Sequence, residues 1–220
     1  HRRLMQAVLK RSQVRLLSFS DFIRTIGLRM SALGTVLAVP FVPPGVPILV
    51  AAVALIDKDG RVLSRIERLN PRLNAYCLVD GVQALASARA SEARWQAHRS
   101  SGAPVGELDG VPTSIKDLIL TRGWPTRRGS RTVDANQPWD IDAPVTARLR
   151  EAGAVLLGKT TTPEFGCKGE TNSPLTGLTR NPWNTAKTPG GSSGGAAAAV
   201  AAGLGPLAVG TDGAGSVRIP

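Results

Sequence analysis

The chain has 220 residues, of which 42% are hydrophobic and 4% aromatic, and its formal net charge is +11. This length suffices for one or two domains with a buried core. Its two histidines and two cysteines show no cluster or close spacing that would indicate a zinc site or a disulfide framework, so we expect no metal and no cofactor. We expect Cys77 and Cys167 to be buried free thiols.

The positive charge is concentrated at the start of the chain. Residues 1–30 contain seven Lys and Arg against one acid, Asp21, which leaves 20 basic and 15 acidic side chains for the rest. A nucleic-acid-binding module typically shows a basic stripe interleaved with aromatic residues. The arginines after residue 60 are instead scattered, so we interpret the charge as a solvated basic surface and expect no nucleic-acid partner.

Residues 1–62 differ in composition from the rest, and we interpret them as a separate N-terminal region. Residues 3–30 combine basic and apolar side chains in a pattern that indicates an amphipathic helix. Residues 31–56 carry no charge and are long enough to span a bilayer, but four prolines between positions 40 and 47 interrupt any helix there. A membrane contact through residues 1–56 is therefore the less favoured interpretation, and we expect a cytoplasmic protein.

From residue 63 onwards, helical segments alternate with short apolar runs. We expect a first helix to end at Asn70 and Pro71, because the residue before a proline disfavours helical backbone. A second helix is predicted over residues 82–96, where good helix formers follow one another. The run over residues 110–117 is β-prone and carries Lys116 at its end.

The same alternation continues towards the end of the chain. Residues 142–153 predict a short helix with Asp142 as its N-cap, Pro144 in its first turn and Gly153 as its stop. Further strands are predicted over residues 154–160 and 206–211, and a further helix over about 193–202. This alternation favours an α/β fold in which a mixed β-sheet is covered by helices.

Serines occur in two glycine-rich loops, which lie on either side of an alanine-rich run. Neither loop matches a phosphate-binding loop, a nucleophile elbow or a dinucleotide fingerprint. His1 and His98 are both remote from these loops in sequence, so we expect a lysine to act as the base. A lysine accepts a proton only when it is neutral, a form that burial favours. Lys116 is the best-placed candidate because it ends a short apolar strand.

Three segments resemble, in order and spacing, the signature of the amidase signature family of Ser-Ser-Lys hydrolases: GVPTSIKD (110–117), TPGGSSGG (188–195) and VGTDGAGSVR (209–218). The resemblance covers about residues 64–220, so we interpret residues 63–220 as the N-terminal portion of an amidase domain with the amidase signature fold. Family members continue beyond the position of Pro220, and that part completes their sheet and substrate pocket. We therefore expect a C-terminally incomplete fold, and we expect residues 1–220 alone to be a poor hydrolase.

The resemblance assigns roles residue by residue. It implies that Ser216 is the nucleophile that attacks an amide carbonyl. Ser192, whose preceding peptide bond is cis in the family, would pass the proton on to a neutral Lys116. The alternative for Ser192, and for Ser193, is a purely structural role as the cap of the helix that follows.

The turn around the nucleophile carries the remaining expected site residues. Backbone N–H groups of Gly213, Ala214 and Gly215 correspond to the oxyanion hole of the family. Ala214 stands where the family commonly has glycine. Its methyl group reduces the space through which a substrate approaches the oxyanion hole. The residues expected to support the site are Ser193, Thr211, Asp212 and Arg218. We expect the first two to bond within the proton relay and the last two to pair and hold the turn.

The implied function is hydrolysis of a small carboxamide to a carboxylate and ammonia or an amine, through an acyl-enzyme. Two alternatives stay open. One is the glutaminase (A) subunit of a tRNA-dependent amidotransferase, with nucleic acid as a further partner. That subunit has a GKTNMDEF-like segment where residues 158–166 read GKTTTPEFG, which favours a stand-alone amidase. The other is a catalytically silent fragment or fusion whose N-terminal arm binds a membrane or an acidic partner. A homodimer also stays open.

Overall fold

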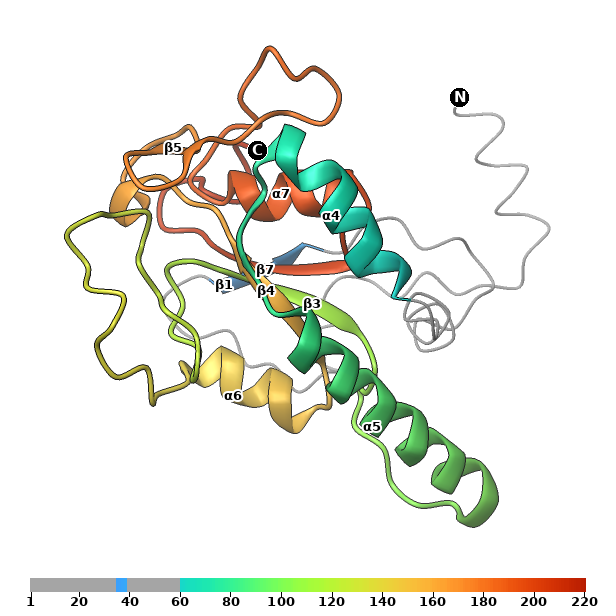
Figure 1. Cartoon of the computed structure of the whole chain (residues 1–220). Coiled ribbons are helices and arrows are strands. Elements are labelled where there is room, and N and C mark those ends of the chain that lie inside the picture. Colours follow the sequence, from blue (N-terminus) through green and yellow to red (C-terminus); the bar gives the residue numbers. More distant parts are fainter. Residues whose placement is uncertain (1–34, 39–59) are drawn as a thin grey trace.

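The computed structural model describes residues 35–38 and 60–220 (Figure 1). The amphipathic helix expected over residues 3–30 lies outside these ranges, as does most of the charge-free run over 31–56. The division of the chain before residue 63 therefore stays a prediction. Among the helices that the structure describes, none has the length and the apolar character needed to cross a membrane.

A five-stranded sheet forms the centre of the described fold, in the order β1-β7-β3-β4-β2. β3 (Pro112–Lys116) lies in the middle and is parallel to both β4 (Val155–Thr160) and β7 (Leu207–Thr211). The outer strands β1 (Thr35–Ala38) and β2 (Tyr76–Val79) run antiparallel to their neighbours. The expected mixed sheet is confirmed, and the apolar runs predicted as strands are β3, β4 and β7.

Helices cover both faces of this sheet. α4 (Arg61–Leu73) and α7 (Gly194–Ala201) lie on one face, and α6 (Pro144–Glu151) lies on the other (Figure 1). α5 (Gly81–Ser101) extends away from the sheet. The short elements are η1 (Glu164–Gly166), β5 (Asn172–Ser173) and β6 (Gly177–Leu178), of which the last two pair with each other.

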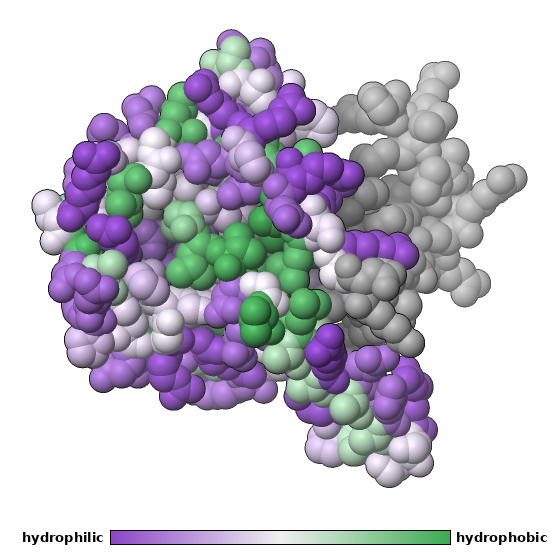
Figure 2. Space-filling view, in the orientation of Figure 1, coloured by the Kyte–Doolittle hydropathy of each residue, from purple (hydrophilic) through white to green (hydrophobic). Residues whose placement is uncertain are grey.

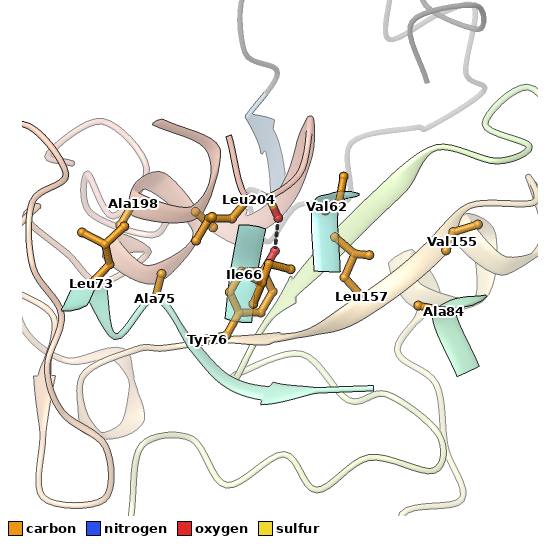
Figure 3. Close-up of a cluster of buried hydrophobic side chains, with 11 residues drawn as sticks. Val62, Ile66, Leu73, Ala75, Tyr76, Ala84, Val155, Leu157, Ala198 and Leu204 are labelled. Carbon is orange, nitrogen blue, oxygen red and sulfur yellow. Dashed lines mark hydrogen bonds between the residues drawn. The ribbon is translucent and has the colours of Figure 1, made fainter. Parts of the chain in front are cut away.

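The sheet is packed between two apolar clusters. On the α6 face, Leu149 is fully buried in a cluster with Ile115 and Val209 from the central strands. On the opposite face, the cluster contains residues of α4, α7, β2 and β4 (Figure 3). There the Tyr76 hydroxyl donates to the Leu204 carbonyl oxygen at 2.8 Å, which satisfies the only polar group of that side chain. The strands that carry the candidate site are therefore fixed from both sides.

The first helix is longer than expected. α4 continues through Pro71 to Leu73 and ends at Asn74, whose backbone is left-handed. Proline has no N–H to give to the carbonyl of Glu67, but Glu67 is exposed, so solvent can reach that oxygen. Asn70 also stabilises the end, because its side-chain oxygen accepts from the backbone N–H groups of Ala75 and Tyr76 at 2.8 Å each. The predicted stop at Asn70 and Pro71 was wrong.

The start of α6 was also wrongly assigned. Its N-cap is Ala143, and Asp142 does not cap it. The Asp142 carboxylate instead accepts from the backbone N–H of Arg122 at 2.7 Å and from Arg150 Nε at 3.1 Å. The carboxylate is thus used by the Arg122 N–H and the Arg150 side chain and is not available to cap the helix. The sequence next to Asp142 does not show that these two groups lie close to it. Pro144 is the first helical residue, as predicted.

Other expectations about single residues were mixed. The helix predicted over residues 82–96 is confirmed within α5, which extends to Ser101. Both cysteines are exposed, so the prediction of buried thiols was wrong. Figure 2 shows hydrophobic residues gathered in the middle of the face seen in Figure 1, with hydrophilic residues around them. Val82 at the start of α5 is an exposed apolar side chain, 85% accessible.

Candidate functional site

Lys116 lies at the end of the central strand β3 and is completely buried. The strands on either side of β3 are β4 and β7, so the Lys116 side chain leaves the sheet inside the protein. Lys116 Nζ donates to three hydroxyl oxygens: Ser192 Oγ at 2.7 Å, Ser193 Oγ at 2.9 Å and Thr211 Oγ1 at 2.9 Å. The structure thus brings Lys116 together with Ser192, Ser193 and Thr211, all expected from the sequence.

The surroundings of Lys116 favour a neutral amine. Burial lowers the pKa of Lys116 to about 7, and attraction by the Asp212 carboxylate opposes that shift. The three partners of the amine are uncharged hydroxyl groups, and Lys116 forms no ion pair within residues 60–220. A lysine with such a pKa is partly neutral at neutral pH and has a lone pair that can accept a proton.

The loop before α7 presents Ser192 and Ser193 to the lysine. The peptide bond between Gly191 and Ser192 is cis, and both serines are buried. Glycine is required at position 191, because a Cβ there would lie 2.6 Å from the backbone carbon of Glu170. The loop can therefore approach the neighbouring chain closely enough for Ser192 to reach Lys116.

Ser193 uses its side chain inside the site and not as a helix cap. It occupies the N-cap position of α7, yet its side chain makes no capping hydrogen bond. Its hydroxyl donates to the carbonyl oxygen of Thr211 at 3.0 Å and accepts from the N–H of Thr211 at 3.2 Å. Ser193 thereby joins the start of α7 to the end of β7. The capping alternative is not what this side chain does here.

Ser216 lies on the turn that follows β7 and is partly buried. Its carbonyl oxygen accepts from the N–H of Ser193 at 3.0 Å, so its backbone is next to the Ser192–Ser193 pair. Its hydroxyl has no hydrogen-bond partner among residues 60–220. The link from Lys116 to Ser192 is thus present, and a link from Ser192 to Ser216 is not formed within the described residues.

The turn is held by Asp212, which forms the expected pair with Arg218. Arg218 Nε and Nη2 donate to the two carboxylate oxygens at 3.0 Å each. The same carboxylate accepts from the N–H groups of Gly215 at 2.7 Å and Val217 at 3.2 Å. Arg218 and these N–H groups hold the pKa of Asp212 well below its usual range. Asp212 therefore acts as the anion that closes the turn.

The backbone donors expected for an oxyanion hole are only partly free. The N–H of Gly215 is engaged with Asp212. In the described part of the chain, the N–H groups of Gly213, Ala214 and Ser216 make no hydrogen bond. Gly213 and Ala214 are exposed, so a ligand can reach these donors. A position for a negatively charged oxygen is therefore available next to Ser216.

Lys159 is a second fully buried lysine, which the sequence reasoning missed. Lys159 precedes Thr160, the last residue of β4, whereas Lys116 is itself the last residue of β3. A lysine close to the end of an apolar run was the signal that could have found it. Lys159 Nζ donates to the Ile119 carbonyl oxygen at 2.5 Å and to Thr126 Oγ1 at 2.8 Å, and lies 3.9 Å from the Asp117 carboxylate. Burial lowers its pKa to about 8. It holds the loop that begins directly after Lys116.

The segment with η1 forms another boundary of the site. A Cβ on Gly166 would lie 3.5 Å from Ser192 Oγ, so this segment passes next to the serine. The neighbouring Phe165 is half exposed, and its N–H donates to the Arg128 carbonyl oxygen at 2.8 Å. Cys167 follows on the exposed side and donates its thiol hydrogen to the Glu164 carbonyl oxygen at 3.0 Å. Neither Phe165 nor Arg128 was named in the sequence reasoning.

This arrangement is suited to transferring protons between hydroxyl groups and an amine in a site shielded from water. The described residues contain no group of three or more His, Cys, Asp and Glu side chains placed to hold a metal ion. Ser216 is partly exposed, whereas the hydrogen-bonded pair of Ser192 and Lys116 is buried.

Comparisons with known proteins give relatives that are similar in sequence and in fold. A family model described as Amidase matches residues 60–220. The A subunit of the glutamyl-tRNA(Gln) amidotransferase of Acidothermus cellulolyticus is 47% identical over 158 residues, which are 72% of this chain and 30% of that protein. The chain spans about a third of the length of the curated relatives it matches.

Two solved structures are similar in fold. A bacterial aryl acylamidase of the amidase signature family matches with a TM-score of 0.67 and 37% identity, over 77% of this chain and 36% of its own. The peptide amidase of Stenotrophomonas maltophilia matches with a TM-score of 0.65 and 36% identity, over 75% of this chain and 34% of its own.

Proposed function

This chain belongs to the amidase signature family, and we propose that it hydrolyses the C–N bond of a small carboxamide by using Ser216, Ser192 and Lys116. The observation that carries the proposal is the 2.7 Å hydrogen bond between Lys116 Nζ and Ser192 Oγ inside a buried site. A buried lysine that has only hydroxyl partners is suited to act as a base, because it can lose its charge near neutral pH.

In the proposed first step, Ser216 Oγ attacks the amide carbonyl carbon. The neutral Lys116 amine has two N–H bonds, so its lone pair accepts a hydrogen bond from the Ser192 hydroxyl before the reaction. The Ser216 proton then passes to Ser192 Oγ while the Ser192 proton passes to Lys116 Nζ. The side chain of Ser216 turns towards Ser192 for this step, and the hydrogen bond from Ser193 N–H to the Ser216 carbonyl oxygen keeps the two segments adjacent. The lysine thereby becomes charged while the carbonyl oxygen becomes an oxyanion.

The oxyanion is stabilised by backbone donors of the turn. The N–H groups of Gly213, Ala214 and Ser216 are the candidates, because the Gly215 N–H is already held by Asp212. The methyl group of Ala214 is exposed and reduces the space beside the oxyanion. Donors fixed in place in this way stabilise the charge that develops in the transition state.

The second step breaks the C–N bond. The proton returns from Lys116 through Ser192 to the leaving nitrogen, which departs as ammonia or an amine, and the acyl group remains on Ser216. Water then attacks the acyl-enzyme, gives a proton to the same relay, and releases the carboxylate and the regenerated Ser216. No cofactor is needed for this sequence.

A second candidate is the glutaminase activity of an amidotransferase A subunit. It is favoured by the curated relatives, several of which carry that name and are 42–49% identical to this chain. The segment GKTTTPEFG at residues 158–166 favours the stand-alone amidase instead. A homodimer and a catalytically silent role remain further proposals for the whole protein.

Hydrolysis assays separate these candidates. In a version of the chain extended at its C-terminus, we expect release of ammonia from small carboxamides in preference to glutamine. We expect no turnover with Ser216→Ala, and turnover reduced by about 10²–10⁴ with Ser192→Ala. Ser100→Ala, at the exposed end of α5, is the matched control and should behave as the wild type. Glutamine preferred over every other amide would favour the amidotransferase role, and turnover retained by Ser216→Ala would remove Ser216 as nucleophile.

A further inference from the structure

A cavity of about 230 Å³ lies away from the serines, between α4, the end of α7 and the loop over residues 179–188. Figure 1 shows this loop beyond the C-terminal end of α4, next to α7. The less exposed part of the cavity lining is apolar and includes Leu69, Leu73 and Ala202. Its exposed part includes Arg65, Arg72 and Trp183. The cavity thus combines an apolar interior with a cationic and aromatic opening.

Trp183 lies on this loop, whose backbone is held by hydrogen bonds. The indole is 85% exposed. The loop is closed by backbone hydrogen bonds, with Asn181 N–H donating to the Lys187 carbonyl oxygen and Lys187 N–H to that of Asn184, both at 2.9 Å. Arg180 N–H donates to the Leu73 carbonyl oxygen at 2.8 Å and so joins the loop to the end of α4. An indole that is exposed beside this cavity offers a bound partner a large apolar contact surface.

The arginines beside the cavity form a row along α4. Arg65, Arg68 and Arg72 are three or four residues apart, so they lie on one side of the helix, and all three are exposed. Arg65 Nε donates to the Ala202 carbonyl oxygen at 2.8 Å, which fixes its guanidinium group at the edge of the cavity. Arg68 and Arg72 make no hydrogen bond or ion pair with any other described residue. A row of exposed guanidinium groups of this kind favours binding of a negatively charged partner.

The cavity is the size of a side chain and not of a typical small-molecule ligand, whose sites measure about 300–1,000 Å³. Trp and Arg are the residues that most often dominate the energy of protein–protein binding. We propose that this surface docks an acidic segment of a partner polypeptide, which places one apolar side chain in the cavity and carboxylates against Arg68 and Arg72. The proposal is independent of the amidase activity.

Charge distinguishes this occupant from the N-terminal residues 1–56. Residues 1–30 carry seven Lys and Arg against one acid, so they are repelled by the arginine row, and residues 31–56 carry no carboxylate. A second copy is disfavoured because the chain has a net charge of +11 and several of its acids, such as Asp109 and Asp212, are already paired with arginines. RNA is less suited, because single-strand binding surfaces stack successive bases on several aromatic side chains. Among the residues that the structure describes, Trp183 is the one aromatic residue that lines the cavity.

The proposal can be tested with a random-peptide library displayed on phage and selected against the full chain. We expect enrichment of peptides in which an aromatic or aliphatic residue is flanked by Asp or Glu. Purified versions of these peptides should bind at least about tenfold more weakly to Arg72→Gln and to Trp183→Ser than to the wild type. Both positions are exposed, so thermal unfolding should be unchanged.

Arg89→Gln, on the exposed surface of α5, is the matched control and should bind the selected peptides as the wild type does. The proposal is overturned if no peptide is enriched, if the enriched peptides lack acidic residues, or if binding is equal in all variants. It is also overturned if oligouridine binds through Arg72 and Trp183 in competition with the peptides, because the surface would then be an RNA site.

Discussion

Lys116 and Lys159 lie at or next to the ends of neighbouring parallel strands, and both side chains are fully buried. Their hydrogen-bond and charge partners give the two amines different properties. Lys116 has three hydroxyl partners and no carboxylate in contact. Loss of its proton therefore removes the free-energy cost of burying a charged amine. Lys159 has a carbonyl oxygen at 2.5 Å and the Asp117 carboxylate at 3.9 Å, so a positive charge on it is compensated. The first amine is suited to exchange protons and the second to hold structure.

Replacing Lys159 should therefore cost stability. In Lys159→Met, Asp117 would lose its cation while staying buried, and removing one member of a buried ion pair typically destabilises a protein by about 3–5 kcal/mol. Urea unfolding measures this loss. Arg148→Gln breaks an exposed pair with Glu151 and should cost no more than about 1 kcal/mol. Equal losses in the two variants would contradict the structural role of Lys159.

At the scale of elements, the fold depends on close contacts between the start of α7 and the strands. A Cβ on Gly195 would lie 2.3 Å from Thr161 Oγ1 and 2.5 Å from the backbone nitrogen of Thr161. Alanine is the better helix former by about 0.5–1 kcal/mol, but a backbone clash of this kind costs about 1–3 kcal/mol. The clash is the larger effect, so Gly195→Ala should be destabilising.

Thermal unfolding of Gly195→Ala should show a lower midpoint than the wild type. Its hydrolytic rate should also fall, because Ser192 and Ser193 directly precede α7. Gly213→Ala is the matched control for stability, since a Cβ at Gly213 would meet nothing within 4 Å. If both glycine variants unfold at the wild-type temperature, α7 does not need its close approach to β4.

At the scale of the whole molecule, the sequence pattern predicted the features that depend on residues close together in the chain. Apolar runs identified β3, β4 and β7, and Lys116 at the end of such a run was found for the same reason. The missed features depend on residues far apart in sequence. Asp142 has Arg122 and Arg150 as partners instead of capping α6, and Lys159 reaches Ile119 and Thr126 across the loop.

The proposed catalytic residues were reached by a different route. Composition and spacing alone left Ser192, Ser193 and Ser216 as serines in glycine-rich loops, and only the resemblance to a known family assigned them roles. Geometry then adds what neither pattern nor resemblance contained. It places the Gly215 N–H on Asp212 and leaves the Ser216 hydroxyl without a partner among the described residues.

The central claim is that Ser216 is activated by a neutral Lys116, and the rate of labelling by a fluorophosphonate probe tests it most directly. With a pKa near 7, Lys116 loses its proton as pH rises through 7, so the labelling rate should rise between about pH 6 and 8 and then level off. Mass spectrometry should place the label on Ser216, and Lys116→Met should abolish both the labelling and its pH dependence. A label on another residue, or the same rate and the same pH profile in Lys116→Met as in the wild type, would contradict the account.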